Sequence, residues 1–135
     1  MGRKREIVQP SGWARPKGYS NGVAAAGRWL FVAGQIGWDP RASRPKFPKT
    51  FAAQFDQALS NFLDVVRAAG GAAEDVAKLT VYVVDKREYL NARARVGEAW
   101  RKHMGRHFPA MALVEVSALL EKDALVEIQA IAAIG

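Results

Sequence analysis

Glu127 is the acidic residue best placed to do chemistry, because it lies inside the apolar segment 124–132 (ALVEIQAIA). A carboxylate in such a segment faces a cleft, pairs with a base, or takes up a proton. Glu115, in the apolar segment 108–119, has the same ambiguity. The residues alone leave two readings of Glu127 open: a catalytic acid, or a structural acid bonded to backbone or to an arginine at a subunit edge.

The two histidines, His103 and His107, are four residues apart, a spacing that can place both imidazoles on one face of a helix. No HExxH glutamate accompanies them, and the basic neighbours Arg101, Lys102 and Arg106 would repel a cation. The chain contains no cysteine, which excludes a thiolate metal site, a disulfide and a cysteine nucleophile. We therefore expect no bound metal, and two exposed histidines near a helix C-terminus, where positive charge is favourable.

Nucleophilic and phosphate-binding chemistry have little support. None of the serines lies in a nucleophile-elbow pattern. Gly34 and Gly37 have the spacing GxxG but no glycine-rich continuation, so they do not predict a phosphate loop.

Basic side chains are concentrated near the N-terminus. Residues 1–49 hold ten Lys and Arg against two acids, whereas residues 50–135 hold ten against eleven, within an overall charge of +7. Residues 1–17 predict an extended basic arm, with a short strand at 6–9 and a Trp13 that needs burial. The skew can indicate nucleic acid, an anionic membrane or an acidic small molecule, or serve solubility alone. No nucleic-acid motif accompanies the charge, so we favour solubility and expect no nucleic-acid partner.

The length of 135 residues, half of them apolar, predicts one compact domain over residues 1–135. No apolar run approaches the roughly 20 residues needed to span a bilayer. No apolar segment follows the basic N-terminus, as one would in a signal peptide. We therefore expect a cytoplasmic protein with no membrane partner.

Local patterns predict the first elements of the fold. Strands at 22–26 and 29–35 are expected to pair as a hairpin around Gly27-Arg28. Thr50 is a good N-cap, and the helix that it begins ends at Gly70-Gly71. Its apolar stripe consists of Phe51, Phe55, Leu59, Phe62 and Val66.

The second half alternates between strands and a helix. Residues 76–84 are apolar on both alternating faces, which predicts a strand buried on both sides. Residues 86–104 predict a second helix, followed by strands at 110–116 and 125–134. One side of that helix carries Leu90, Ala94, Gly97 and Trp100.

The order β-β-α-β-α-β-β predicts an α+β fold, with one mixed β-sheet and two helices on one face. The other face of the sheet then has no helix to cover it, although the last two strands are apolar on both sides. A partner subunit would cover it.

Six segments, in this order and spacing, resemble the reactive intermediate deaminase family (Rid, or YjgF, also called endoribonuclease L-PSP-like). The segments are GYS at 18–20, FVAGQIGWDP at 31–40, FAAQFDQALSNFLDVVRAAGG at 51–71, DVAKLTVYVVD at 75–85, FPAMALVEVSAL at 108–119 and ALVEIQAIA at 124–132. The resemblance implies a chorismate mutase-like fold and a homotrimer. It also implies interface clefts for small carboxylates, hydrolysis of enamines and imines such as 2-aminoacrylate, and no cofactor.

Three parts of the family site find counterparts here. The family tyrosine corresponds to Tyr19, and the cleft-lining glutamate corresponds to Glu127. The family's SGQ segment corresponds to Ala33, Gly34 and Gln35, so its serine is replaced by alanine. The resemblance implies that these residues line the cleft, with Glu127 as general base or water-positioning group.

Two further positions depart from the family pattern. The carboxylate-binding arginine of the family's PAR motif corresponds to Met111, and an asparagine of the second helix corresponds, within one residue, to Arg93. A guanidinium binds a carboxylate through two charge-assisted hydrogen bonds, which a thioether cannot form. We therefore identify the chain as a divergent member of the family and expect slow turnover of 2-aminoacrylate, unless Arg93 supplies a replacement.

Three functions remain open on these residues. The first is an enamine or imine deaminase acting on a differently bound substrate. The second is a non-catalytic module that binds a small ligand in the same cleft. The third, which we rank lowest, is binding related to RNA or translation.

Overall fold

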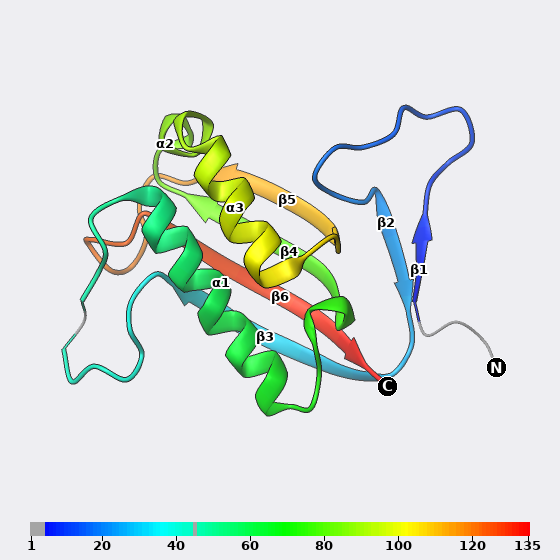
Figure 1. Ribbon diagram of the computed structural model, residues 1–135, viewed down its shortest axis with the longest axis horizontal. Coiled ribbons are helices and arrows are strands. Elements are labelled where there is room, and N and C mark those ends of the chain that lie inside the picture. Colours follow the sequence, from blue (N-terminus) through cyan, green and yellow to red (C-terminus); the bar gives the residue numbers. More distant parts are fainter. Residues whose placement is uncertain (1–4, 45) are drawn as a thin grey trace.

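The computed structural model describes residues 5–44 and 46–135, and it is built around a four-stranded sheet with helices on one face (Figure 1). The strand order is β3-β6-β4-β5, with bounds Arg28–Ile36, Val126–Ile134, Val76–Val83 and Ala110–Glu115. The β4–β5 pair is parallel, and the ladders of β6 with β3 and β4 are antiparallel. The predicted α+β class, a mixed sheet with helices packed on one face, is confirmed.

Helix α1 (Phe51–Ala68) forms as its sequence predicts. The Thr50 side chain accepts a hydrogen bond from the Ala53 amide at 3.2 Å, which satisfies one of the free N–H groups of the first turn. All five residues of the predicted apolar stripe are buried. Gly70, at a φ of 88°, then lets the chain leave the helix.

Two buried polar side chains fix α1 to the strand ends. Gln54 donates to the carbonyl oxygen of Asp123 at 2.9 Å, and its own side-chain oxygen accepts from the Leu125 amide at 2.8 Å. Asn61 donates to the carbonyl oxygen of Ile36 at 3.0 Å. Because both side chains are almost fully buried, losing either set of bonds would leave unsatisfied polar groups. These bonds hold the end of β3 and the start of β6 in place.

The predicted second helix is two helices, α2 (Lys86–Asn91) and α3 (Arg93–Met104). Ala92 between them has φ −106° and ψ 16°, outside the helical range, so the prediction of one continuous helix is wrong. The bend allows Tyr89 to pack edge-on against Phe51 of α1, with ring centroids 6.3 Å apart. Among the described residues, no helix is long and apolar enough to cross a membrane.

The buried side of α3 also differs from the predicted one. It consists of Val96, Ala99, Trp100 and Met104. Leu90, which we expected on the same side of one helix as Trp100, is 46% exposed on α2, whereas Trp100 is buried. The break at Ala92 changes the helical phase, so one stripe cannot run through both helices.

The two N-terminal strands pair with each other. We had expected the second of them to pair with the next strand of the main sheet. β1 (Arg5–Val8) and β2 (Gly22–Ala25) form a separate antiparallel pair, while β3 pairs with β6 (Figure 1). Gly27, between β2 and β3, has a φ of 142°, and a Cβ there would lie 2.5 Å from the carbonyl oxygen of Ile134. Because β2 pairs with β1 and β3 pairs with β6, the predicted hairpin of 22–26 with 29–35 is wrong.

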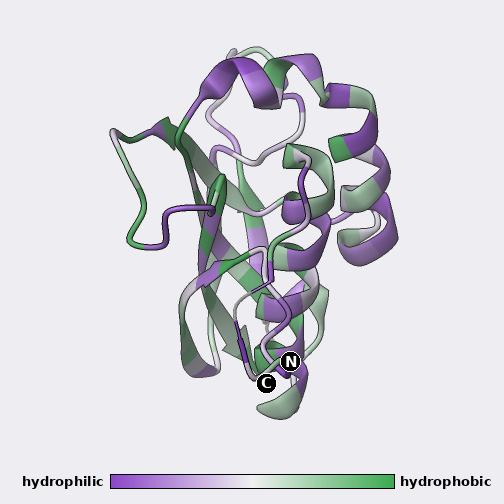
Figure 2. Cartoon of the chain, turned by 90° about the vertical axis from the view of Figure 1, so that its left-hand side faces the viewer, coloured by the Kyte–Doolittle hydropathy of each residue, from purple (hydrophilic) through white to green (hydrophobic). Residues whose placement is uncertain are grey.

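The sheet buries only one face completely within this chain. On β4, Leu79 and Val81 are fully buried against the helices, whereas Tyr82 points the other way and is half-buried. Strand β4 is therefore not buried on both sides in the single chain. On β3, Trp29 and Phe31 are 53% and 73% exposed. Figure 2 shows the strands beside the helical layer, with hydrophobic stretches in both.

Candidate functional site

Glu127 and Gly34 lie against each other on neighbouring strands. Glu127, on β6, pairs with Tyr82 of β4, on the face of the sheet away from the helices. The β3–β6 ladder changes register just before Gln35, so Ala33 and Gly34 form an irregularity in the strand. A Cβ at Gly34 would lie 2.6 Å from the carboxyl carbon of Glu127. A glycine at this position therefore leaves room for the carboxylate.

The Glu127 carboxylate has no charged partner among the described residues. The residue is half-buried. Gln35 donates from its side-chain amide to the carbonyl oxygen of Ala33 at 3.2 Å, across the irregularity. A carboxylate in this position can accept hydrogen bonds from water or from a ligand N–H group.

Met111 and Arg93 line a pocket of about 200 Å³ between α3 and the edge of the sheet. Met111 pairs with the buried Leu79, so its side chain lies on the helix side of the sheet. Trp100 also lines the pocket and stacks on Phe108, with ring centroids 5.9 Å apart. The Trp100 indole N–H is buried without a hydrogen-bond acceptor among the described residues. Most of the lining is apolar, so the pocket suits an apolar group.

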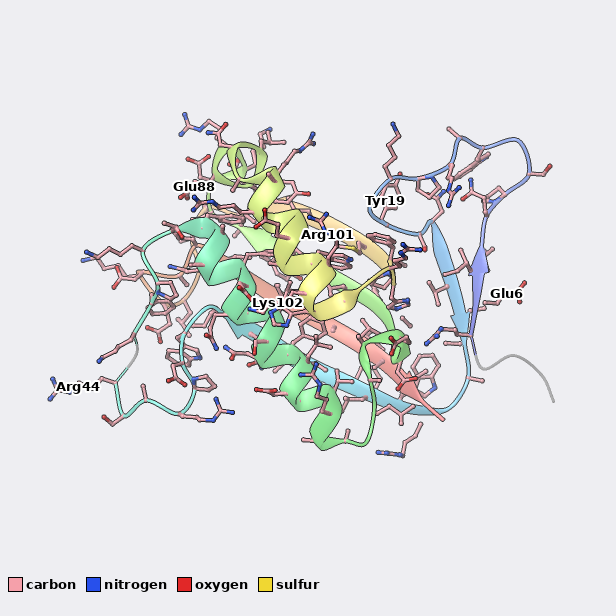
Figure 3. The ribbon with its side chains drawn as sticks, viewed as in Figure 1. Glu6, Tyr19, Arg44, Glu88, Arg101 and Lys102 are labelled. Carbon is pink, nitrogen blue, oxygen red and sulfur yellow. The ribbon has the colours of Figure 1, made fainter. Side chains whose placement is uncertain are left out.

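Tyr19 lies on the loop before β2, beside the start of β5 (Figure 3). Ser20 anchors this loop, because its amide donates to the carbonyl oxygen of Pro109 at 3.0 Å and its hydroxyl donates to that of Phe108. Tyr19 is 42% exposed and lines a pocket of about 620 Å³. Gly18 and Phe108 border this pocket and the smaller one, so the two pockets adjoin.

The predicted site residues thus do not form one site within one chain, because Glu127 lies on the open face whereas Met111, Arg93 and Tyr19 line the two adjoining pockets. Along β4, Leu79 pairs with Met111 and Tyr82 pairs with Glu127. Leu79 and Tyr82 are an odd number of residues apart, so these pairs lie on opposite faces of the sheet. Strand β4 also separates Met111 from Glu127, a distance of roughly 10 Å for two strand spacings. A single site containing Tyr19, Glu127 and Met111 stays a prediction that calls for a second copy of the chain.

The family model described as Endoribonuclease L-PSP matches residues 13–134. The chain belongs to this family, also called the Rid or YjgF family. A RutC family protein of Pyrococcus horikoshii is 36% identical over 128 residues, which make up 95% of this chain and 97% of the relative. The 2-iminobutanoate/2-iminopropanoate deaminase of Escherichia coli is 37% identical over 106 residues, which make up 78% of this chain and 80% of the relative.

Solved structures of Rid proteins have the same fold. A Rid protein from Yersinia pestis superposes with a TM-score of 0.84 at 30% identity, covering 98% of this chain and 100% of that one. The YjgF gene product of E. coli gives a TM-score of 0.69 at 35% identity, covering 85% and 87%. E. coli TdcF, solved with bound serine, gives 0.67 at 29% identity, covering 96% and 99%.

Both histidines of this Rid chain are partly buried and form contacts. The prediction that they are exposed is therefore wrong. The ring nitrogen Nε2 of His103 lies 2.5 Å from Asp56 Oδ1, and that of His107 donates to the carbonyl oxygen of Val76 at 2.7 Å. Burial would raise the pKa of Asp56, but hydrogen bonds from His103 and Lys102 outweigh it and hold this pKa below its ordinary value. Within the described residues, no three metal-binding side chains cluster together.

Sequence reasoning did not select several residues that surround Tyr19 in this Rid chain. Trp13, Arg15, Arg106 and His107 line the same pocket. Trp13, which we expected to be buried, is 63% exposed. The sequence did point to these residues. Trp13 and Arg15 lie within six positions of Tyr19, and Arg106 and His107 directly precede the FPAM segment.

Proposed function

We propose that this Rid protein hydrolyses the C=N bond of imines, and of enamines that tautomerise to imines, in clefts between the subunits of a homotrimer. The observation that carries the proposal is the Glu127 carboxylate, half-buried on the open face, without an ion pair among the described residues and accommodated by Gly34. The 37% identical relative named as an imine deaminase supports this class of reaction.

The proposed reaction needs an activated water. Water adds to the imine carbon, and the resulting carbinolamine breaks its C–N bond to give a carbonyl compound and ammonia. Glu127 accepts a proton from the attacking water and passes it to the substrate nitrogen, which leaves as ammonia; a positioned general base contributes about 10²–10⁴ in rate. Tyr19 donates its hydroxyl proton in a hydrogen bond to the substrate. Gln35, Ala33 and Gly34 form the wall beside the carboxylate.

A homotrimer would complete this site. In one chain, Glu127 lies apart from the adjoining pockets of Met111 and Tyr19, and a neighbouring subunit could bring its own pockets to the open face. The exposed Trp29 and Phe31 support such a contact, because large apolar side chains gain most from burial. The interface that we propose buries the strands 110–116 and 125–134.

Met111 sets the expected substrate range. It occupies the position where the family resemblance places a carboxylate-binding arginine, and its thioether carries no charge. We propose that 2-aminoacrylate, a small substrate held chiefly by its carboxylate, is therefore turned over slowly. Arg93 lines the same pocket as Met111 and is one candidate for a replacement guanidinium.

The test is ammonia release from a panel of freshly generated imines. We expect release from at least one member, and Glu127→Gln should lower kcat about 100-fold or more without changing the oligomer mass. Glu98→Gln, on the exposed side of α3, is the matched control and should retain activity. Binding of imine analogues without any ammonia release would instead identify a non-catalytic binding module.

A further inference from the structure

The larger pocket beside Tyr19 has a composition that the proposed hydrolysis does not explain. We call it the arm pocket, and it is lined by Trp13, Arg15, Tyr19, Arg106, His107 and Phe108, together with residues of β1. Its volume is about 620 Å³, several times that of the pocket at Met111. It combines exposed aromatic rings with guanidinium groups.

The loop that carries Trp13 is held in place by hydrogen bonds. Gln9 donates to the carbonyl oxygens of Trp13 and Ala14 at 3.3 and 3.2 Å, and it accepts from Asn21 at 2.7 Å. The Trp13 amide closes a turn onto the carbonyl oxygen of Pro10. These bonds fix the loop, yet they leave the indole 63% exposed. A large aromatic ring that is positioned but uncovered is typical of a binding surface.

The charge of the arm pocket is positive and unbalanced. No aspartate or glutamate of the described chain lines it. Arg15 and Arg106 form no ion pair with a described residue, whereas Arg67 and Arg87 do. Two uncompensated guanidinium groups are suited to binding a carboxylate.

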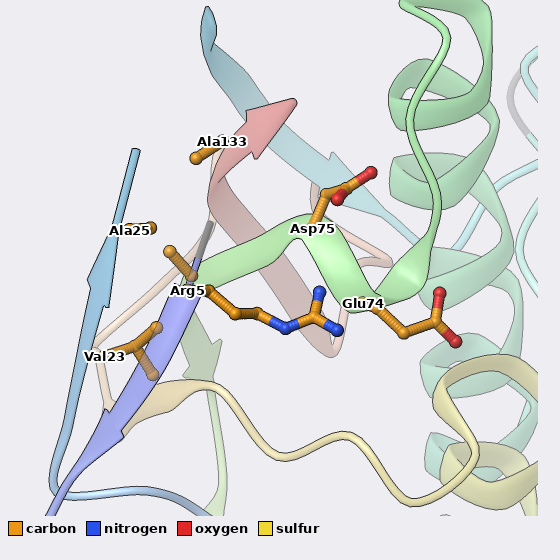
Figure 4. Close-up of a pocket in the computed structure, with 7 residues that line it drawn as sticks. Arg5, Val23, Ala25, Glu74, Asp75 and Ala133 are labelled. Carbon is orange, nitrogen blue, oxygen red and sulfur yellow. The ribbon is translucent and has the colours of Figure 1, made fainter. Parts of the chain in front are cut away.

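Arg5 also lines the arm pocket and forms no ion pair with a described residue. Figure 4 shows its guanidinium extending toward Glu74 and Asp75 in an adjoining pocket of about 380 Å³. Val23 and Ala133 flank that adjoining pocket and contribute no charge. The positive charge available to a ligand of the arm pocket therefore comes chiefly from Arg15 and Arg106, because the Arg5 side chain extends into the adjoining pocket.

His107 is held in one orientation at the wall of the arm pocket. A carbonyl oxygen can only accept, so the contact with Val76 requires that Nε2 carries the hydrogen. In the neutral ring, Nδ1 is then the acceptor. An imine or ammonium N–H is a donor that such an acceptor could bind.

We propose that the arm pocket binds the carboxylate of a 2-imino acid with a planar, aromatic substituent, through Arg15 and Arg106, while Trp13 and Tyr19 stack on the substituent. The identification of the ligand as an imino acid rests on the proposed function. The recognition of an aromatic carboxylate rests on the residues of the pocket alone. The two arginines take the place of the guanidinium that Met111 cannot supply. Arg93, the other candidate, lines the smaller and mostly apolar pocket with Met111, and the variants below distinguish it from the two arginines.

Binding is tested by calorimetry with three probes and requires no turnover. The probes are phenylpyruvate, pyruvate, which lacks the ring, and phenylacetone, which lacks the carboxylate. We expect phenylpyruvate to bind about tenfold or more tightly than either of the others, because it alone uses the arginines and the aromatic rings together.

Variants assign the contacts. The double variant Arg15→Gln/Arg106→Gln should weaken phenylpyruvate binding about tenfold or more, whereas Arg41→Gln, a surface control, should not. Trp13→Ala should weaken phenylpyruvate about fivefold or more but leave pyruvate unchanged, and Trp13→Phe should restore part of the loss. All these side chains are exposed, and circular dichroism checks that the fold is retained.

Three results would overturn the inference. The first is unchanged phenylpyruvate binding in the arginine double variant. The second is a larger loss in Arg93→Gln than in that double variant, which would place the carboxylate in the smaller pocket. The third is displacement of phenylpyruvate by single-stranded RNA with strongly salt-dependent affinity, which would assign the surface to nucleic acid. Loss of ammonia release with phenylpyruvate binding intact would refute the proposed function alone.

Discussion

Two residues have opposite effects on the expected chemistry. Gly34 keeps the Glu127 carboxylate free of steric overlap, since a Cβ there would lie 2.6 Å from the carboxyl carbon. Met111, in contrast, puts a neutral thioether on the helix side of β5, in a pocket of about 200 Å³. In the proposed site, Glu127 is therefore the catalytic group, while Met111 supplies no charge to bind a carboxylate. Chemistry and substrate binding can therefore be separated by substitution.

Met111→Arg is the substitution that separates them. A guanidinium at this position would add two charge-assisted hydrogen bonds to a substrate carboxylate and would orient the imine carbon. We expect kcat/KM for 2-aminoacrylate to rise about tenfold or more, measured by a coupled assay on freshly generated substrate. Met111→Gln, which adds polarity without charge, should give no such gain. Wild-type rates already equal to those of arginine-bearing relatives would contradict this reading of Met111.

Helix α1 depends on its first turn. The Thr50 hydroxyl accepts a hydrogen bond from the Ala53 amide in the first turn of the helix. Thr50→Ala removes this acceptor. We expect the free energy of unfolding to fall by about 1 kcal/mol, measured by urea titration, whereas Thr50→Ser should retain most of it. An unchanged midpoint in Thr50→Ala would show that solvent caps the turn equally well.

The contact between α1 and α3 should make stability depend on pH. The pKa of Asp56 is lowered from its ordinary 3.8 by His103 and Lys102, so folding favours the ionised carboxylate. This contribution is complete above the unfolded pKa and is lost as the pH falls through the lower folded pKa. We expect the urea midpoint to drop below about pH 4, and to drop less in Asp56→Asn.

A matched control is available for this pH effect. Asp64, also on α1, contacts Arg67 at 3.5 Å and Arg41 at 3.8 Å, both longer than the contact between Asp56 and His103. Asp64→Asn should therefore keep the pH profile of the wild type. If Asp56→Asn and Asp64→Asn flatten the profile equally, the contact with His103 has no special part in it.

Elements were predictable where their determinants are local. Helix α1 follows from its apolar period and from Thr50, both of which lie within the helix or next to it. The pairing of β3 with β6 joins residues about one hundred positions apart, and no local pattern distinguishes it from a β2–β3 hairpin. The break at Ala92 carries neither proline nor glycine, so no residue type at this position marks it in the sequence.

At the scale of the whole molecule, the sequence and its family resemblance name candidate site residues but do not arrange them. The family resemblance implies that Glu127 and Met111 line one cleft, yet the register of β4 places them on opposite faces of the sheet. The arm pocket was not predictable, because it joins the loop around Trp13 to residues 106–108 through Ser20. The pocket forms only when residues 5–20 and 106–108 lie side by side, and their spacing along the chain does not indicate that contact.

The open face of the sheet should drive assembly into a trimer. The open face presents Phe31 at 73% exposure and Val114 at 41%, and burying a phenylalanine contributes roughly 1.5–3 kcal/mol. We expect light scattering at micromolar concentration to give three times the chain mass of 14.8 kDa. Phe31→Glu should shift the mass toward the monomer, because each interface would then bury an unpaired charge. Leu90→Glu, which adds the same charge on α2, should leave the trimer intact. A monomeric wild type would contradict the prediction, and Glu127 would then have to act without groups from a second chain.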